Sequence, residues 1–376
     1  MKTELELNEM ILELTHKIIE TDPELLKHLN EKPLTVPYQE NPEITVITLT
    51  SYYDSLVGLL RDYEENLTKS LLKEKVENLP VTEIITMELE NSEHNLLTEA
   101  NGISISYNDV GEGKIPVIFL HGFPFDKSMW KGQLEGLKSS NRLIACDIRG
   151  FGKSTDEKTP LSMDLFGDDL VSFMDKLHIQ KANLCGLSMG GYIALNSVKR
   201  FPERFETLIL CDTQCIADST KVKENRYKAI EKINHDGPAE FNEEFIKNVF
   251  HPDSLTDKTE LVKSLRSVVF GNSKVIIASG LTALAERSET CSALSSISIP
   301  TLIICGREDV VTPLEQSEFM HKQIKGSVLK VIDNAGHVSN LEQPEEFNKS
   351  LTEFLNSLHS ISHQEHITEP IGSKSV

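Results

Sequence analysis

Short apolar runs alternate with amphipathic segments along most of this chain. The apolar runs have the length and composition of strands that are buried on both faces of a parallel sheet. Several segments between them repeat apolar residues at three- and four-residue spacing, which predicts helices. The predicted strands are Pro116–Leu120, Arg142–Cys146, Ala182–Gly186, Thr207–Cys211, Thr301–Cys305 and Val328–Ile332. The predicted helices are Leu161–Leu177, Ser188–Arg200 and Pro344–Leu358.

A turn signal precedes these runs. Asn101-Gly102 stands between the strand-like segments LLTEA and ISISYND, and an Asn-Gly pair favours a tight hairpin turn. An antiparallel pair is therefore expected to open the domain. The repetition of strand, turn and helix after it predicts an α/β fold, with a mostly parallel sheet covered by helices.

The interval between the fourth and fifth of the six runs is too long for one crossover connection. It holds four charged amphipathic segments that are predicted to be helical: Val222–Asp236, Phe241–Val249, Asp257–Val269 and Ile277–Arg287. We interpret residues 214–297, to the nearest few positions, as a helical lid inserted into a domain of residues 96–358.

Residues 1–95 differ in kind from the rest. They are acidic, and helical periodicity occurs in Leu5–Ile19 and Ser51–Lys75, on either side of a proline-containing stretch. Two interpretations stay open: a small helical module docked on or tethered to the main domain, or a segment that forms a homodimer or binds a protein partner. Residues 359–376 are polar and are expected to form a flexible tail.

The charge balance narrows the classes of function. The 376 residues include 38 Lys and Arg against 58 Asp and Glu, a formal net charge of −20. This balance disfavours nucleic acid, whose binding depends on cations that neutralise phosphates. The sequence shows neither an apolar window of about 18 residues, as a membrane span needs, nor a readable signal peptide. We expect a cytoplasmic protein with neither nucleic acid nor membrane as a partner.

The six cysteines could in principle form three disulfides, but most of them suit a buried apolar role, and they indicate no metal site. Cys146, Cys185, Cys211 and Cys305 each end an apolar run, so they are interpreted as small buried hydrophobic residues. Cys211 and Cys215 have no further Cys or His arranged nearby as zinc ligands would be. No structural metal is predicted.

The segment GLSMG, from Gly186 to Gly190, follows a predicted strand and begins a predicted helix. In that context a G-x-S-x-G pentapeptide presents a nucleophilic serine, here Ser188, on a tight and strained turn. The small flanking residues let neighbouring elements approach closely. Alone, the motif is weak, because it also occurs by chance and in structural turns.

Two backbone amides are predicted to stabilise an oxyanion. His121-Gly122 ends a predicted strand, and the N–H of the next residue, Phe123, can face the serine. The N–H of Met189 lies at the start of the helix, where unpaired amides favour an anion. His121 itself suits loop shaping, and we assign it no proton transfer.

An acid and a histidine follow the serine, each just past a predicted strand: Asp309 in the GRED turn and His337 after Gly336. A serine hydroxyl needs an imidazole to accept its proton, and the imidazole needs a carboxylate to hold its tautomer. Singly, each residue could be an ordinary loop acid or a cap. Their order and strand-end positions together predict Ser188 as nucleophile, His337 as base and Asp309 as orienting acid.

Six blocks of sequence carry a resemblance to a known family. They are LHGFPFDKSMW (Leu120–Trp130), DIRGFGKS (Asp147–Ser154), CGLSMGGYIAL (Cys185–Leu195), LCDT (Leu210–Thr213), GREDVVTP (Gly306–Pro313) and NAGHVSNLEQPEEF (Asn334–Phe347). From about Leu96 to Leu358 the chain resembles the lid-bearing α/β-hydrolase superfamily, and is similar to 3-oxoadipate enol-lactonase-like hydrolases and carboxylesterases. The resemblance implies a mostly parallel eight-stranded sheet. It does not extend to residues 1–95, and the lid matches loosely.

Asp212 is an alternative to Asp309, because some members of the superfamily supply the acid from the strand that precedes it. The GRED turn matches the commoner arrangement, so Asp309 is favoured, and Asp212 is expected to hydrogen-bond near the lid hinge. Related dehalogenases and epoxide hydrolases attack with an aspartate. The serine at position 188 makes those reactions unexpected here.

These residues predict a serine hydrolase that needs no cofactor. It would cleave a carboxylic ester, lactone or thioester of a small acyl substrate through an acyl-enzyme. Carbon–carbon bond hydrolysis and acyl transfer to an alcohol or peroxide at the same site stay open, as does a non-catalytic interaction protein on a hydrolase scaffold. An apolar pocket is expected from residues that ordinary core packing explains equally well: Phe123, Phe125, Trp130, Phe245 and Leu281.

Overall fold

The computed structural model describes residues 93–156 and 160–365. The chain divides into two units, Met1–Leu89 and Glu90–Val376, and all described residues belong to the second. The helices predicted at Leu5–Ile19 and Ser51–Lys75 lie outside the described residues, as does nearly all of the predicted N-terminal module.

Eight strands form one sheet in the order β1-β2-β4-β3-β5-β6-β7-β8. β1 and β2 are the predicted hairpin, β2 also pairs antiparallel with β4, and the remaining pairs are parallel. The strands are β1 (Leu96–Ala100), β2 (Ile103–Val110), β3 (Val117–Leu120), β4 (Leu143–Cys146), β5 (Ala182–Leu187), β6 (Phe205–Cys211), β7 (Thr301–Gly306) and β8 (Val328–Ile332). Each predicted strand is present within a residue or two, which confirms the fold class.

Alternate residues of the central strands point into two separate cores, as the two-residue period of a strand requires. In β3, Ile118 and Leu120 join one core, whereas Val117 and Phe119 join the other. Helices α6, α7 and α13 cover the first face, and α5 and α15 cover the second. The helices outside the lid are η1 (Lys127–Trp130), α5 (Lys131–Leu137), α6 (Met163–Lys176), α7 (Met189–Arg200), η2 (Pro202–Arg204), α13 (Leu314–Gln323), α14 (Ser339–Glu342) and α15 (Pro344–Glu365).

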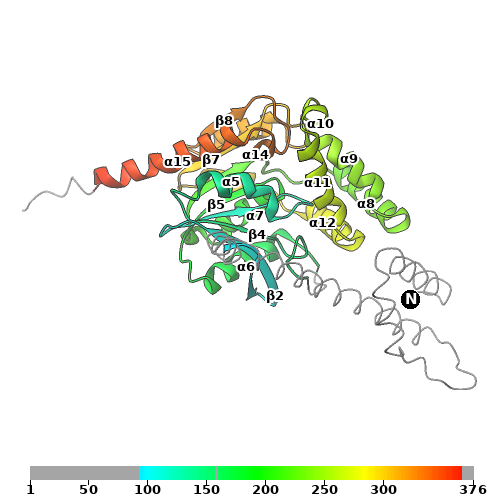
Figure 1. Ribbon diagram of the computed structural model, residues 1–376, viewed down its shortest axis with the longest axis horizontal. Coiled ribbons are helices and arrows are strands. Elements are labelled where there is room, and N and C mark those ends of the chain that lie inside the picture. The colour runs from blue at the N-terminus through cyan, green and yellow to red at the C-terminus, as the bar shows by residue number, and fades with distance from the viewer. Residues whose placement is uncertain (1–92, 157–159, 366–376) are drawn as a thin grey trace, which may run out of the picture. The chain divides into compact units, whose positions relative to one another are not determined.

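The inserted lid lies between β6 and β7, as predicted, and its helices gather at one side of the sheet (Figure 1). It comprises α8 (Thr220–Asp236), α9 (Ala239–Val249), α10 (Ser254–Asp257), α11 (Thr259–Gly271), α12 (Lys274–Glu286) and η3 (Cys291–Ser296). Within it, α8 packs against α12, and α9 packs against α11. Over the described residues no single helix has the length and apolar character to cross a membrane; α11 and α12 reach it only jointly, as a pair bent by 94°.

A disulfide joins Cys215, just before the first lid helix, to Cys291, just after the last α-helix of the lid. The sequence did not indicate this pair. The other four cysteines are free and buried, as predicted. Disulfides are rare in the reducing cytoplasm, so this bond lends no support to the expected compartment, which stays a prediction.

The last helix is longer than the sequence pattern indicated. α15 continues to Glu365, past residue 359, where the flexible tail was expected to begin (Figure 1). Apolar periodicity ends at Leu358, but no Gly or Pro follows before Glu365 to stop the helix. The loss of the amphipathic pattern therefore does not mark the end of the helix.

Candidate active site

Ser188 stands at the sharp turn between β5 and α7. Its backbone has φ 54° and ψ −113°. Residues other than glycine rarely adopt this conformation, and those that do are concentrated at functional sites. A Cβ on Gly186 would lie 2.2 Å from the carbonyl oxygen of Gly190, and one on Gly190 would lie 2.3 Å from that of Leu120. Both glycines are therefore required by close backbone approach. The Thr213 hydroxyl donates to the Ser188 carbonyl at 2.8 Å and helps to hold the turn.

The three residues predicted as nucleophile, base and acid come together in one continuous hydrogen-bonded chain. His337 Nε2 lies 2.8 Å from Ser188 Oγ, and His337 Nδ1 lies 2.8 Å from Asp309 Oδ2. None of the three exceeds 8% exposure. With Nδ1–H donating to the carboxylate, Nε2 is the nitrogen that can accept the serine proton, which is the arrangement that nucleophilic acyl transfer requires.

The turn after β7 holds the Asp309 carboxylate in place. Its Oδ1 accepts the N–H groups of Val311 at 2.8 Å and Thr312 at 3.0 Å, and the Thr312 hydroxyl donates to Oδ2 at 2.7 Å. Burial by itself would raise the pKa of Asp309, but His337 and the Thr312 hydrogen bonds outweigh burial and hold that pKa below its usual value. Asp309 is therefore ionised and fixed in orientation.

The carboxylates around His337 also change the pKa of its imidazole. Burial would lower the pKa of His337, but the negative charge of Asp309 and its hydrogen bond raise it above the ordinary value. Asp212 and Glu342 act in the same direction with smaller effects. These surroundings favour the protonated imidazole, which is the form that acceptance of a serine proton would create.

Asp212 lies beside the hydrogen-bonded chain of Ser188, His337 and Asp309 but is not part of it. Its Oδ1 accepts the Gly306 N–H at 2.7 Å, and its Oδ2 accepts the Ser339 hydroxyl at 2.6 Å. The structure therefore places Asp309, and not Asp212, in hydrogen bond with His337. Burial, reinforced by the nearby charge of Asp309, raises the pKa of Asp212 to about 8. The carboxyl therefore links the end of β6, just before the inserted helices, to the last residue of β7 and the first residue of α14.

Glu342 fastens the histidine loop to the lid. Its fully buried carboxylate accepts the Gly336 N–H at 2.6 Å and the His251 N–H at 2.8 Å. The N–H of His337 donates to the carbonyl of Val249, the last residue of α9, at 2.8 Å. In the sequence Glu342 resembles an ordinary acid on a short polar helix, so only the tertiary structure reveals this anchor.

The residues predicted to form an oxyanion hole flank the serine. Met189 is the first residue of α7, so its N–H has no acceptor within the helix. A Cβ on Gly122, the neighbour of Phe123, would lie 3.2 Å from Ser188 Cβ. His121 accepts the Ile148 N–H at Nε2, 2.9 Å away, and donates from Nδ1 to the Gly122 carbonyl at 2.8 Å. Burial lowers the pKa of His121, which agrees with a neutral, loop-shaping histidine.

The predicted pocket residues separate into two groups. Phe125 lies next to the lid, with its ring centroid 5.6 Å from that of Phe245. Trp130 instead packs at 4.9 Å from Phe119 and 6.2 Å from Phe347, in the core between the sheet and α15. Leu281 is likewise part of a buried core, on α12. Trp130 and Leu281 are therefore both buried core residues, and the structure does not place either of them in a substrate pocket.

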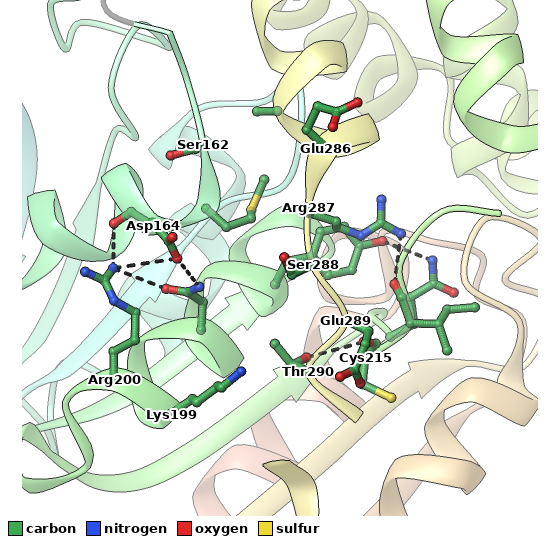
Figure 2. A pocket seen from close by; sticks show the side chains of 16 residues that line it. Ser162, Asp164, Lys199, Arg200, Cys215, Glu286, Arg287, Ser288, Glu289 and Thr290 are labelled. Carbon is green, nitrogen blue, oxygen red and sulfur yellow. Dashed lines mark hydrogen bonds and ion pairs between the residues drawn. The ribbon is translucent and has the colours of Figure 1, made fainter. Parts of the chain in front are cut away.

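A surface pocket of about 290 Å³ lies apart from these residues, between α6, α7 and the end of the lid. Figure 2 shows Asp164 and Arg200 on one side and the lid residues from Glu286 to Thr290 on the other. Its lining includes none of the three residues of the hydrogen-bonded chain. Within residues 93–156 and 160–365, no group of three or more His, Cys, Asp or Glu side chains is arranged to hold a metal ion.

The fold and this site define an α/β hydrolase. The family model described as alpha/beta hydrolase fold matches residues 115–344, and the chain belongs to that family. It is 30% identical to 3-oxoadipate enol-lactonase 2 of Acinetobacter baylyi, over 67% of this chain and 93% of the relative. An esterase from Thermogutta terrifontis has 34% identity and a TM-score of 0.67, covering 71% of this chain and 98% of its own. A meta-cleavage product hydrolase from Pseudomonas fluorescens has 26% identity and a TM-score of 0.60, covering 71% and 100%.

Proposed function

We propose that this protein is a serine hydrolase that cleaves a carboxylic ester, lactone or thioester through an acyl-enzyme. The observation that carries the proposal is the buried chain of hydrogen bonds from Asp309 through His337 to Ser188. The relatives named as an enol-lactonase and an esterase support the same class of bond.

Each step of the proposed reaction is assigned to a group of this chain. Ser188 Oγ attacks the substrate carbonyl carbon as its proton passes to His337 Nε2. The N–H groups of Phe123 and Met189 hold the oxygen that becomes negative. His337 then gives the proton to the departing oxygen or sulfur, which leaves an acyl-serine. A water molecule, deprotonated by the same imidazole, attacks the acyl-serine, and the imidazolium returns that proton to Ser188 Oγ as the acid is released.

The decisive experiment compares the wild type with Ser188→Ala on p-nitrophenyl butyrate, together with labelling by a fluorophosphonate. We expect turnover and labelling by the wild type, and a loss of kcat on the order of 10⁶-fold in the variant. Ser197→Ala is a matched control, because Ser197 is a buried serine on α7 whose hydroxyl has no hydrogen-bond partner among the described residues. It should keep wild-type kcat.

Two outcomes would contradict the proposed function and favour a different one. A folded wild type that neither turns over the ester nor takes the label would refute a serine hydrolase and favour the non-catalytic interaction protein. Labelling at Ser188 without hydrolysis of esters, lactones or thioesters, but with cleavage of a vinylogous diketone, would favour carbon–carbon bond hydrolysis. The similarity to the meta-cleavage product hydrolase is the reason for testing the diketone as well as the esters.

A further inference from the structure

One face of lid helix α9 extends across the site. Phe241, Phe245 and Val249 recur at four-residue spacing, so they lie on one side of the helix. The ring centroids of Phe241 and Phe245 lie 6.4 Å and 6.2 Å from that of Phe123, and the Val249 carbonyl accepts the N–H of His337. Helix α9 therefore contacts the predicted oxyanion residue through two side chains and the base through a backbone carbonyl.

Helix α12 supports the ring of Phe123 from a second direction. A Cβ on Gly280 would lie 2.6 Å from that ring and 3.2 Å from the ring of Phe151. The Phe123 and Phe151 rings meet edge to face at 5.9 Å. We call Phe123, Phe151, Phe241 and Phe245 the aromatic box. Phe241 and Phe245 are only partly buried, whereas Phe123 and Phe151 are buried.

The charges near the box are negative. Asp309, which is ionised, and Glu342 are buried around His337, whereas Asp212, with a pKa of about 8, is largely neutral at pH 7. Buried cations of the same domain are already held by carboxylates, in the pairs Lys127–Asp147, Arg149–Asp169 and Arg287–Asp218. The faces of the phenylalanine rings also carry partial negative charge. An acyl group with its own carboxylate would lose hydration here and meet like charge.

We propose that the acyl group of the substrate is uncharged and apolar, with aromatic groups preferred, and that it binds against the partly buried rings of the aromatic box, Phe241 and Phe245. Substrates that carry a second carboxylate on the acyl side are rejected by that site. The inference rests on the proposed acyl-enzyme function and adds to it the class of acyl group.

The first test uses the full-length protein and a matched pair of esters. p-Nitrophenyl hexanoate and mono-p-nitrophenyl adipate have acyl chains of equal length that differ in a terminal methyl or carboxylate. We expect kcat/KM for hexanoate to exceed that for adipate by about 100-fold or more, after subtraction of the uncatalysed rate, since one unpaired buried charge outweighs the similar chain contacts. Values for adipate within tenfold of hexanoate would overturn the proposal.

The second test assigns the preference to the lid. In Phe245→Leu and in Phe241→Leu, the ratio of kcat/KM for p-nitrophenyl 3-phenylpropanoate to that for the acetate should fall several-fold, because ring–ring contact is lost. In Phe245→Lys the adipate-to-hexanoate ratio should rise by more than tenfold. Phe270→Leu is the control, because Phe270 lies on α11, stacks with Arg266 and is outside the box. It should leave both ratios as in the wild type.

Failures of the two proposals are distinguishable. Absence of turnover on all four esters, with no fluorophosphonate labelling, would reject the serine hydrolase and with it the acyl-group inference. Turnover of the esters with ratios that do not change in Phe245→Leu, Phe241→Leu and Phe245→Lys would reject the aromatic box alone.

Discussion

Replacing Asp309 by asparagine tests how the site orients its base. The new side chain can fit in only one useful way, because Asp309 Oδ1 accepts two backbone N–H groups, from Val311 and Thr312. Those donors require an oxygen, so the carboxamide oxygen takes the position of Oδ1. The NH₂ group then replaces Oδ2 and faces Nδ1 of His337, 2.8 Å away in the wild type.

An NH₂ group in that position donates to Nδ1 and therefore selects the tautomer with the proton on Nε2. That nitrogen can no longer accept the proton of Ser188. The same exchange in other serine hydrolases costs about 10⁴-fold in kcat, equivalent to about 5 kcal/mol of activation free energy. We expect a loss of this size for Asp309→Asn, measured as kcat on p-nitrophenyl butyrate at pH 7, with thermal unfolding as a check that the variant is folded.

Asp212→Asn is the matched comparison. With a pKa of about 8, the Asp212 carboxyl is largely neutral at pH 7. An asparagine keeps one oxygen for the Gly306 N–H and offers an NH₂ to the Ser339 hydroxyl, so both wild-type contacts have a counterpart. We expect kcat within tenfold of the wild type. If Asp212→Asn abolished activity and Asp309→Asn did not, the assignment of the acid would be refuted.

Three further predictions follow from the same geometry. Because Asp309 raises the pKa of His337 and the base must be neutral to act, kcat/KM should rise with pH through a midpoint above 6.5; a midpoint below 6.5 would contradict this reasoning. Gly190→Ala places a methyl group 2.3 Å from the Leu120 carbonyl oxygen, so urea unfolding should show a loss of about 1–3 kcal/mol; wild-type stability would show that the approach is looser. Asn242→Leu removes a buried amide that has no hydrogen-bond partner among the described residues, and should raise stability by about 1–3 kcal/mol in the same assay, whereas a decrease would point to a partner for that amide.

Local pattern in the sequence was sufficient for the sheet, the helical insertion and the sharp turn at Ser188. Buried strands appear as short apolar runs because both faces of each strand are covered, and the carboxyl ends of such strands are where a fold of this class gathers its reactive groups. Ser188, Asp309 and His337 each follow a strand, so their positions along the chain already predicted that they would meet. The glycines around Ser188 carried the same information, since close backbone approach permits no Cβ.

Tertiary structure alone decided the contacts between segments that are distant in the chain. Two aspartates, Asp212 and Asp309, follow neighbouring strands. Only the direction of each side chain shows that Asp309 forms a hydrogen bond with His337, whereas Asp212 forms one with Ser339. Trp130 and Phe125 stand in the same aromatic block, yet one packs under α15 and the other meets the lid. The Cys215–Cys291 bond and the Glu342 anchor also join distant segments. Hydrophobic periodicity specifies which face of an element is buried, but not which neighbour covers it, because that depends on how all the elements pack together.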